Sequence, residues 1–307
     1  MSVITQRCPR CGNENREDSH QCSFCGFRLR EEKIEEFYLF RRIEAEWTDP
    51  HPWYLKIYYI ITDPPRAFWD INHKRDESPG FLIYLFSSLL YGLIGAAFFN
   101  HFQIVAVGDV TEIGFNVQFL YGLSFFVAFL LFGLIYQLIL FAFLIWIFGR
   151  GANLAVDFSE RLESRFGELE EEAPRYRKSE MSPFSVYRGG VLQQQASYKF
   201  QMLLAAFTPF LIINTIKIFV VLIGLPSFQI QIPGDTPATL FDTVFQSPVW
   251  LVLDILDFIT IAFWIPILIT LAIRELSNAS TYRVLISSLS VGFLAGLFLF
   301  LLKRILI

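Results

Sequence analysis

Four cysteines near the N-terminus are the residues whose type and spacing indicate chemistry most directly. They form two Cys-x-x-Cys pairs, each followed by a glycine: Cys8-Pro9-Arg10-Cys11-Gly12 and Cys22-Ser23-Phe24-Cys25-Gly26. Two such pairs supply four thiolates, the ligand set that suits tetrahedral Zn²⁺, and each glycine eases the turn around the metal. Because four thiolates leave no open coordination position, we expect one structural zinc ion and not a catalytic metal. A disulfide pair is the alternative, which a reducing cytoplasmic location disfavours.

Residues 1–30 are therefore predicted to form a small zinc-binding module. In spacing and flanks, including Asn13 and Phe24, they resemble the zinc-ribbon family found in many prokaryotic proteins. Such a module has little core of its own, so the metal would supply most of its folding energy. We expect it to act by contact, with a cytoplasmic protein partner, a nucleic acid or the rest of this chain. His20 is expected to face solvent and not to replace a cysteine.

Nucleic acid is the least favoured of these partners. The arginines of the module alternate with acidic residues, and the chain as a whole carries a formal net charge of −4. A nucleic-acid surface would instead need a continuous basic patch to neutralise phosphates. The sequence therefore predicts no main role in nucleic-acid binding.

The rest of the chain contains five long apolar stretches. The composition is 54% hydrophobic and includes 34 phenylalanines, which is too apolar for a soluble protein with so few charged groups. About 20 apolar residues in a helix cross the roughly 30 Å of bilayer hydrocarbon. The stretches that approach or exceed this length are residues 81–101, 119–148, 200–225, 249–273 and 284–302. They predict an all-α polytopic membrane protein with five transmembrane helices, preceded by the zinc ribbon and accompanied by cytoplasmic amphipathic helices.

The basic residues indicate how these helices are oriented. Lys and Arg are abundant before the first stretch and in the second loop but absent from the first and third loops. Since basic residues collect in cytoplasmic loops, we expect the N-terminus in the cytoplasm and, after five crossings, the C-terminus outside. Lys303 and Arg304 then lie at the outer end and oppose this assignment. The expected domains are 1–30, a juxtamembrane segment 31–80, and a transmembrane domain 81–307 with a cytoplasmic helical loop 150–199.

Two polar segments show the spacing of amphipathic helices. Residues 31–47 predict one such helix, packed on another cytoplasmic helix or lying on the membrane surface; its apolar positions are Phe37, Phe40, Ile43 and Trp47. Another is predicted to continue from the second span, to end at Pro174 and to meet the first helix. Its apolar positions are Leu154, Phe158, Leu162, Phe166 and Leu169. Between ribbon and spans, residues 52–61 carry aromatic side chains expected at the level of the lipid headgroups.

The order of several weak motifs after residue 50 resembles Yip1-domain proteins of the prokaryotic type. These motifs are residues 62–71 (Thr-Asp-Pro-Pro-Arg-Ala-Phe-Trp-Asp-Ile), Gly189-Gly190, Thr208-Pro209 and Arg274-Glu275-Leu276-Ser277. The resemblance implies a polytopic membrane protein. Eukaryotic members act in vesicle trafficking and associate with small GTPases, so a small GTPase is one partner that the resemblance implies. The chain lacks the Tyr-Gly-Pro type motif of those members.

Small residues mark where the helices are expected to pack closely. In lipid, helices associate through close backbone approach, because burial between helices brings no hydrophobic gain. Such residues recur every four positions in the first and fifth spans: Ser88, Gly92 and Ala96, and Ser288, Gly292 and Gly296. These faces are predicted to pack tightly within the bundle or in a homo-oligomer.

Ionisable residues within the spans are the remaining candidates for a site. A charge at membrane depth is costly, so each is a functional candidate. We expect Lys217 to form an ion pair with Asp257, aided by Asn214 on the helix of the lysine and by Asp254 one turn from Asp257. A structural clamp is favoured over a proton or ion relay, because a relay needs further polar steps.

The sequence carries no catalytic motif of the kinds found in membrane or nucleotide-dependent enzymes, so we expect no enzymatic activity. The favoured function is an integral membrane scaffold or adaptor that recruits a cytoplasmic partner or shapes the bilayer, in a trafficking-like role. The alternative is a transporter or channel whose polar path uses Lys217, Asp254 and Asp257.

Overall fold

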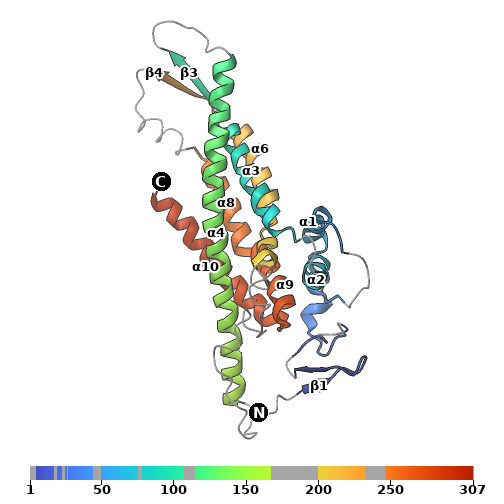
Figure 1. Cartoon of the computed structure of the whole chain (residues 1–307). Helices are drawn as coiled ribbons and strands as arrows, with labels where there is room; N and C mark the ends of the chain where they lie inside the picture. The colour runs from blue at the N-terminus through green and yellow to red at the C-terminus, as the bar shows by residue number, and fades with distance from the viewer. Residues whose placement is uncertain are drawn as a thin grey trace.

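In the computed structural model the described residues are 5–16, 19–22, 25, 27–43, 50–74, 78–106, 115–166, 200–232 and 247–306. Five helices in this part are long and apolar enough to cross a membrane, which confirms the predicted polytopic helical fold (Figure 1). The spans are Gly80–Phe99, Phe119–Ala152, Phe200–Gly224, Val249–Ser277 and Thr281–Lys303. Each lies within a few residues of its predicted position, because long apolar runs are a strong local signal.

The first, second and fifth spans belong to the continuous helices α3 (Gly80–Phe99), α4 (Phe115–Phe166) and α10 (Thr281–Leu306). Helix α4 continues beyond the second span, as expected, and ends at Phe166. The side chains of α4 beyond Ala152 lie outside the described residues, as do Pro174 and Gly189-Gly190. The predicted contact between this extension and residues 31–47 therefore stays a prediction.

The third span is interrupted where it reaches a proline. Residues 206–208 form a turn in which the Thr208 N–H bonds to the Ala205 carbonyl, and α6 (Pro209–Gly224) begins immediately afterwards. Pro209 has no N–H to donate, and its ring obstructs a regular helix on its N-terminal side. The break therefore follows from the sequence.

The fourth span is interrupted in a related way. It consists of α8 (Val249–Ile259), a single π-helical turn η3 (Thr260–Trp264), and α9 (Ile265–Ser277). Pro266 cannot donate a hydrogen bond to the preceding turn, and the wider π turn absorbs the irregularity. Carbonyl groups of this turn consequently lie open to close approach by a neighbouring helix.

Two short strands follow the first and third spans and pair with each other. Strand β3 (Phe102–Ala106) pairs in parallel with β4 (Phe228–Ile232), with Phe102 opposite Phe228. Both strands begin with Phe-Gln-Ile, and Gly-Asp recurs at the same spacing after each, as Gly108-Asp109 and Gly234-Asp235. The units α3–β3–α4 and α6–β4–α8 thus share an element order, a strand register and a sequence pattern. They form an internal repeat whose copies run in the same direction.

The opposite end of the bundle, here called the ribbon end, carries the N-terminal elements (Figure 1). Strands β1 (Thr5–Arg7) and β2 (Glu14–Arg16) pair in antiparallel fashion in the ribbon. Two helices, α1 (Trp53–Thr62) and α2 (Pro64–Lys74), lie beside the ends of the spans, and α2 contacts α9.

Residues 31–43, here called the strap, do not form the predicted amphipathic helix. They contain two short 3₁₀ helices, η1 (Lys33–Glu36) and η2 (Tyr38–Phe40), and then continue in extended conformation. The helical spacing of Phe37, Phe40 and Ile43 was therefore misleading. The reason is that the carbonyls from Phe40 to Ile43 accept hydrogen bonds from side chains elsewhere in the molecule, as described below.

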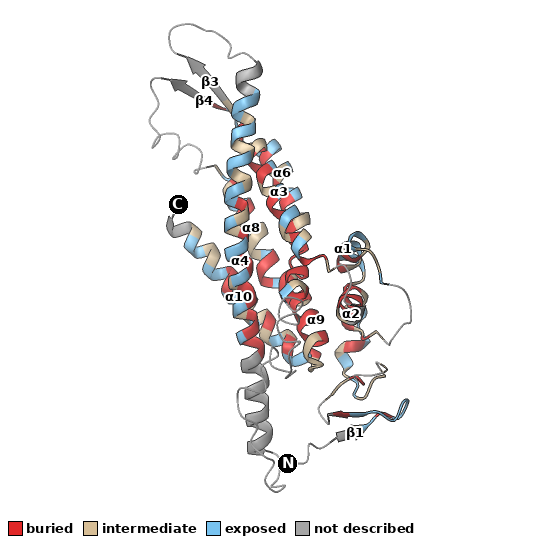
Figure 2. Ribbon diagram, viewed as in Figure 1, coloured by how far each residue is buried: buried red, intermediate tan, exposed pale blue. Residues whose placement is uncertain are grey.

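Burial follows the pattern of a protein whose outer surface faces lipid. Buried residues line the contacts between helices, whereas the outer faces of α4 and α10 are exposed (Figure 2). Those exposed faces are apolar: side chains such as Phe132, Ile139, Leu294 and Phe298 are more than half exposed. An apolar surface of this extent is stable in lipid and would be a liability in water.

The glycine stripe of α10 packs against the irregular part of the fourth span. A Cβ at Gly292 would lie 2.3 Å from Pro266 Cγ and 2.8 Å from the Ile261 carbonyl oxygen. At Gly296 the nearest atoms would be Phe258 Cδ2 at 3.3 Å and Ala262 Cβ at 3.5 Å, close to ordinary contact. The α3 stripe packs differently, since Gly92 meets Phe126 and Leu130 of α4. The two predicted faces therefore contact separate partners.

We predict that Gly292→Ala destabilises the bundle by about 1–3 kcal/mol, because the added methyl group meets a rigid ring and a backbone oxygen. Gly292→Leu should cost more. Gly296→Ala, one turn along the same helix, is the matched control and should have a smaller effect. Thermal unfolding in detergent measures the difference, and equal midpoints for the two alanine variants would contradict the packing described.

Candidate metal centre and intramembrane charge cluster

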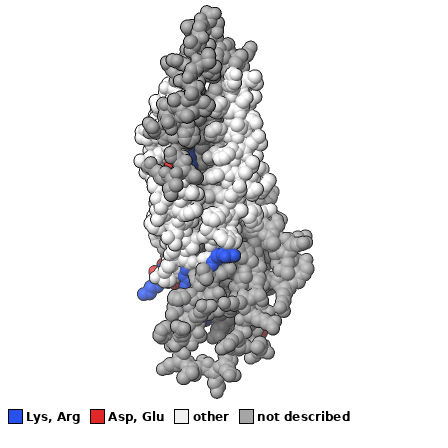
Figure 3. All heavy atoms as spheres, turned by 90° about the vertical axis from the view of Figure 1, so that its left-hand side faces the viewer, with Lys and Arg blue, Asp and Glu red and all other residues white. Residues whose placement is uncertain are grey.

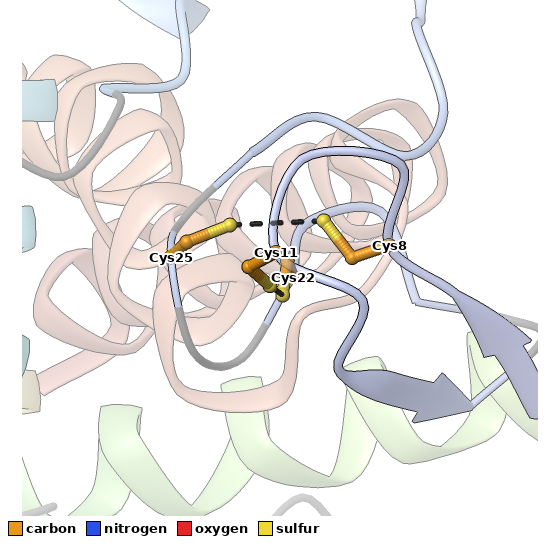
Figure 4. A group of neighbouring side chains, drawn as sticks. All are labelled: Cys8, Cys11, Cys22 and Cys25. Carbon is orange, nitrogen blue, oxygen red and sulfur yellow. Dashed lines mark hydrogen bonds between the residues drawn. The ribbon is translucent and has the colours of Figure 1, made fainter.

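The four cysteines of the ribbon converge on one point (Figure 4). All four sulfur atoms lie within 4.8 Å of one another, with 3.7 Å between Cys8 and Cys25 and 3.6 Å between Cys11 and Cys22. Tetrahedral zinc with bonds of about 2.3 Å places its sulfur ligands about 3.8 Å apart, whereas a disulfide bond is about 2.05 Å long. The separations fit one structural Zn²⁺ and exclude disulfides in this conformation.

Backbone hydrogen bonds fold the first cysteine pair into a metal-binding turn. The Cys8 N–H donates to the Asn13 carbonyl, and the Gly12 N–H donates to the Cys8 carbonyl. Gly12 has a φ of 72°, a left-handed conformation that glycine adopts without steric cost. The Asn15 side-chain amide donates to the Cys22 sulfur at 3.4 Å and so stabilises a negative thiolate there.

The prediction that His20 faces solvent is wrong. Its side chain is largely buried, and its Nδ1 lies 3.7 Å from the Glu32 carboxylate. Burial lowers the pKa of His20, and the positive charge of Arg42 acts in the same direction. The imidazole is therefore part of the contact between the ribbon and the strap, and it is not one of the converging metal ligands.

Four consecutive carbonyl groups of the strap accept hydrogen bonds from distant side chains. Arg274 donates to the carbonyls of Phe40 and Arg41 at 2.5 and 3.3 Å. From the ribbon, Arg28 donates to the Arg42 carbonyl at 2.9 Å, and Gln21 Nε2 donates to the Ile43 carbonyl at 3.1 Å. Because two of these oxygens bond to Arg274 of α9 and two bond to ribbon side chains, the strap joins the ribbon to the fourth span.

A second link runs directly from the ribbon to the turn between α9 and α10. The Gln21 N–H donates to Asn278 Oδ1 at 3.0 Å, and Asn278 Nδ2 donates to the Gln21 carbonyl at 2.7 Å. Asn278 has a φ of 53° and ends α9 in the left-handed conformation that asparagine tolerates. Its side chain thereby pairs with both backbone groups of the residue next to Cys22.

Buried charges hold the strap in place. Arg42 Nε lies 2.6 Å from Glu35 Oε1, which also accepts a hydrogen bond from the Thr281 hydroxyl at 2.7 Å. Arg274 is fully buried and lies 3.0 Å from Glu275 Oε1. Two guanidinium groups and two carboxylates thus balance in charge, which makes their burial tolerable. None of these pairs was expected from the sequence.

Within the spans, the structure brings together the residues singled out by their charge. The Lys217 ammonium contacts the Asp257 carboxylate as an ion pair. Lys303 joins them, with its Nζ 3.0 Å from Asp254 Oδ1 and 3.0 Å from Asp257 Oδ2. The resulting intramembrane charge cluster has two positive and two negative groups from α6, α8 and α10. Lys303, which seemed misplaced at the outer end of the fifth span, is paired here.

An uncharged polar network lies beside this cluster. Asn214 donates to the Ser87 hydroxyl at 3.1 Å and not to the charged groups. Gln137 on α4 donates to the Ser87 carbonyl and accepts from the Ser88 hydroxyl at 3.1 and 3.2 Å. Ser88 therefore serves a hydrogen-bond network between helices in addition to close packing. Of the other residues in the predicted close-packing stripes, Ala96 is half buried and Ser288 is buried.

The charge cluster borders a small cavity of about 30 Å³, room for about two water molecules. Its lining comes from both units of the internal repeat and from α10, and includes Tyr91, Tyr136, Gln137, Lys217 and Asp257. Figure 3 shows a few charged atoms of both signs among the uncharged, white atoms of the spans. Lys303 is partly exposed and forms one edge of the cluster.

Sequence reasoning missed several residues of these sites. Gln137 and Lys303 could have been found as polar residues within or at the end of apolar stretches. Asn278 followed by a short turn is a recognisable helix-ending signal, although its partner Gln21 cannot be inferred from it.

Comparison with known proteins identifies one part of the chain. Residues 7–29 match the zinc-ribbon domain family. Comparisons with curated proteins and with solved structures give no match. The matched region is the module predicted from the cysteines, and no family match supports the Yip1-domain resemblance of the remainder.

We predict that Asp257→Asn destabilises the folded protein by about 3–5 kcal/mol, because it leaves Lys217 buried without a carboxylate and removes a partner of Lys303. Asp254→Asn removes one contact with a partly exposed lysine and should cost less. Adding Lys217→Met to Asp257→Asn should recover part of the loss. Unfolding in detergent measures all three variants; equal effects of the two aspartate substitutions would contradict the assignment.

Proposed function

We propose that the protein is a non-enzymatic integral membrane scaffold or adaptor whose ribbon end binds a cytoplasmic protein partner. The observation that carries the proposal is the joining of ribbon, strap and α9–α10 turn by hydrogen bonds and buried ion pairs. These parts form a platform that is already ordered before binding. Order present in advance lowers the entropic cost of recruiting a partner.

The strap offers a surface suited to such a partner. Phe37 and Tyr38 are 61% and 50% exposed, outside the five spans. Arg41 lies over the Tyr38 ring at 4.6 Å, and the Tyr38 hydroxyl donates to the Thr62 carbonyl at 3.4 Å. Exposed aromatic rings beside an arginine are enriched at the centres of protein interfaces. We place the contact with the partner here.

The proposed orientation puts the ribbon end in the cytoplasm and the C-terminus outside. Basic residues at the ribbon end support it, including Arg28 of the ribbon, Arg41 of the strap and Arg66 of α2. The opposing signal from Lys303 loses weight because its ammonium pairs within the intramembrane charge cluster. A reporter fused after Ile307 should be active only outside the cytoplasm, and cytoplasmic activity would contradict this orientation.

A trafficking-like or bilayer-shaping role rests on the resemblance to Yip1-domain proteins. Asn72, which directly follows the 62–71 segment in α2, donates to the carbonyl of Glu275 in the 274–277 segment at 2.9 Å, and α2 contacts α9. This contact supports a shared role for the two segments. A small GTPase is one class of partner within this proposal, and the missing Tyr-Gly-Pro motif argues against it.

The adaptor proposal predicts a specific partner that depends on the platform. Full-length protein would be treated with a mild crosslinker in cells, purified, and its adducts identified by mass spectrometry. A cytoplasmic protein captured by the wild type should be lost with Phe37→Ala/Tyr38→Ala and with Cys22→Ser. Tyr54→Ala is the matched control, since Tyr54 is 57% exposed and lies on α1, outside the ribbon, the strap and the α9–α10 turn. Identical adducts for all variants would contradict the proposal.

A second candidate, a transporter or channel, is favoured by the cavity beside the intramembrane charge cluster. In transporters built from internal repeats, substrate sites lie between the repeats and are bordered by interrupted helices. Here the cavity lies between the two repeat units, and Phe210 and Ile261 place the interruptions of the third and fourth spans at its wall. The residues of this path would be Lys217, Asp254, Asp257 and Lys303.

Flux assays in liposomes decide between clamp and transport. If the cluster transports, wild-type protein should move protons, Na⁺ or K⁺ across the vesicle membrane. Asp257→Asn should then abolish flux while the protein still elutes as a folded species from a sizing column. Absence of wild-type flux for all three ions would contradict ion transport. If, in addition, Asp257→Asn failed to fold, a structural clamp would be the role of the cluster.

A further inference from the structure

We propose that zinc binding by the ribbon and the conformation of the turn between the last two spans are thermodynamically linked through Asn278. The proposal is independent of whether the protein is an adaptor or a transporter. It assigns to the ribbon the role of a zinc-responsive latch on the membrane domain.

The first element of the latch is the position of Gln21. This residue precedes the metal ligand Cys22 and forms an isolated antiparallel bridge with Arg28, which holds its backbone beside the second cysteine pair. Both of its backbone groups are taken by Asn278, at 3.0 and 2.7 Å. A two-point contact of this kind needs the N–H and C=O groups held in one geometry. In a module with so small a core, the metal holds them.

The second element is the turn itself. The Asn278 N–H donates to the Arg274 carbonyl at 2.8 Å, which ends α9. Arg42 of the strap donates to Asn278 Oδ1 at 3.3 Å and to the Ala279 carbonyl at 2.7 Å. The chain from residue 278 to 280 connects two spans, so its geometry sets how they leave the ribbon end.

Linkage follows from these two contacts. If zinc folds the ribbon, and the folded ribbon bonds to the turn, then loss of zinc removes two hydrogen bonds from the turn. The converse must also hold, because coupling between two binding events is reciprocal. A substitution at Asn278 should therefore weaken zinc binding at cysteines more than 250 positions earlier in the sequence.

The test separates the side chain of Asn278 from its backbone conformation. Asn278→Gly removes the side-chain amide and keeps the left-handed backbone accessible. Asn100→Gly is the matched control, since Asn100 ends α3 at the opposite end of the bundle and is exposed. Zinc affinity would be measured on full-length protein in detergent by competition with a chelator of known affinity. Cys22→Ser provides the reference for loss of the site.

We expect Asn278→Gly to weaken zinc binding by about tenfold, within the usual range of coupling between sites, and Asn100→Gly to leave it unchanged. In wild-type protein, removal of zinc should speed hydrogen exchange of the amides from Asn278 to Val284. This second measurement needs no variant and so does not depend on the folding of one. Equal zinc affinities for wild type and Asn278→Gly, or unchanged exchange after zinc removal, would overturn the proposal.

Discussion

Burial of Arg274 is the constraint on which the ribbon end of the molecule depends. Its guanidinium group has no exposed surface, although it carries a charge and five N–H groups. Glu275 balances the charge. Nη2 bonds to the Glu275 carboxylate and to the Arg41 carbonyl, Nη1 donates to the Phe40 carbonyl, and Nε has no hydrogen-bond partner among the described residues. Both carbonyls lie where the strap leaves its second 3₁₀ helix and continues in extended conformation. One buried side chain therefore favours an extended strap, and the strap in turn brings the ribbon against the membrane domain.

The need to pair buried polar groups also governs the interior of the spans. Polar groups in a bilayer have no bulk water to bond with, so each must find a partner within the protein. The intramembrane charge cluster meets this requirement with two lysines and two aspartates, and the neighbouring amides and hydroxyls form their own network. Balanced charge makes the cluster tolerable, and the adjoining cavity has room for about two water molecules. A clamp and a transport site share this chemistry, which is why function has to be separated from folding by experiment.

Sequence reasoning succeeded where the signal is local. The spans follow from long apolar runs, and the metal centre follows from cysteine spacing; both are contained within a few tens of residues. Lys217 and Asp257 were paired correctly because an isolated charge in a membrane needs a partner of opposite charge, and the spans contain few candidates. Lys303 was not assigned to the cluster, because its place at the end of a span suggested the membrane surface.

The errors arose where distant contacts override local pattern. Apolar spacing in the strap indicates which residues face a surface, but it does not reveal where the backbone hydrogen bonds go. Those bonds are made by Arg274, Arg28 and Gln21, and the first of these lies more than 200 residues away. The paired strands were likewise missed, although the repeated Phe-Gln-Ile and Gly-Asp signals could have revealed the internal repeat. The sequence left open whether the ribbon contacts a partner, a nucleic acid or the rest of this chain, and the structure shows hydrogen bonds from the ribbon to the strap and to the α9–α10 turn.

Hydrogen exchange at the Gln21 amide tests this integration most directly. That N–H donates to the Asn278 side chain, so its protection reports docking and not merely the folding of the ribbon. The measurement would use zinc-loaded, full-length protein in lipid nanodiscs. Docking predicts that the Gln21 amide exchanges as slowly as amides in the interior of α9. Exchange at the rate of an unstructured peptide, with zinc still bound, would show a ribbon that moves freely and would contradict the account.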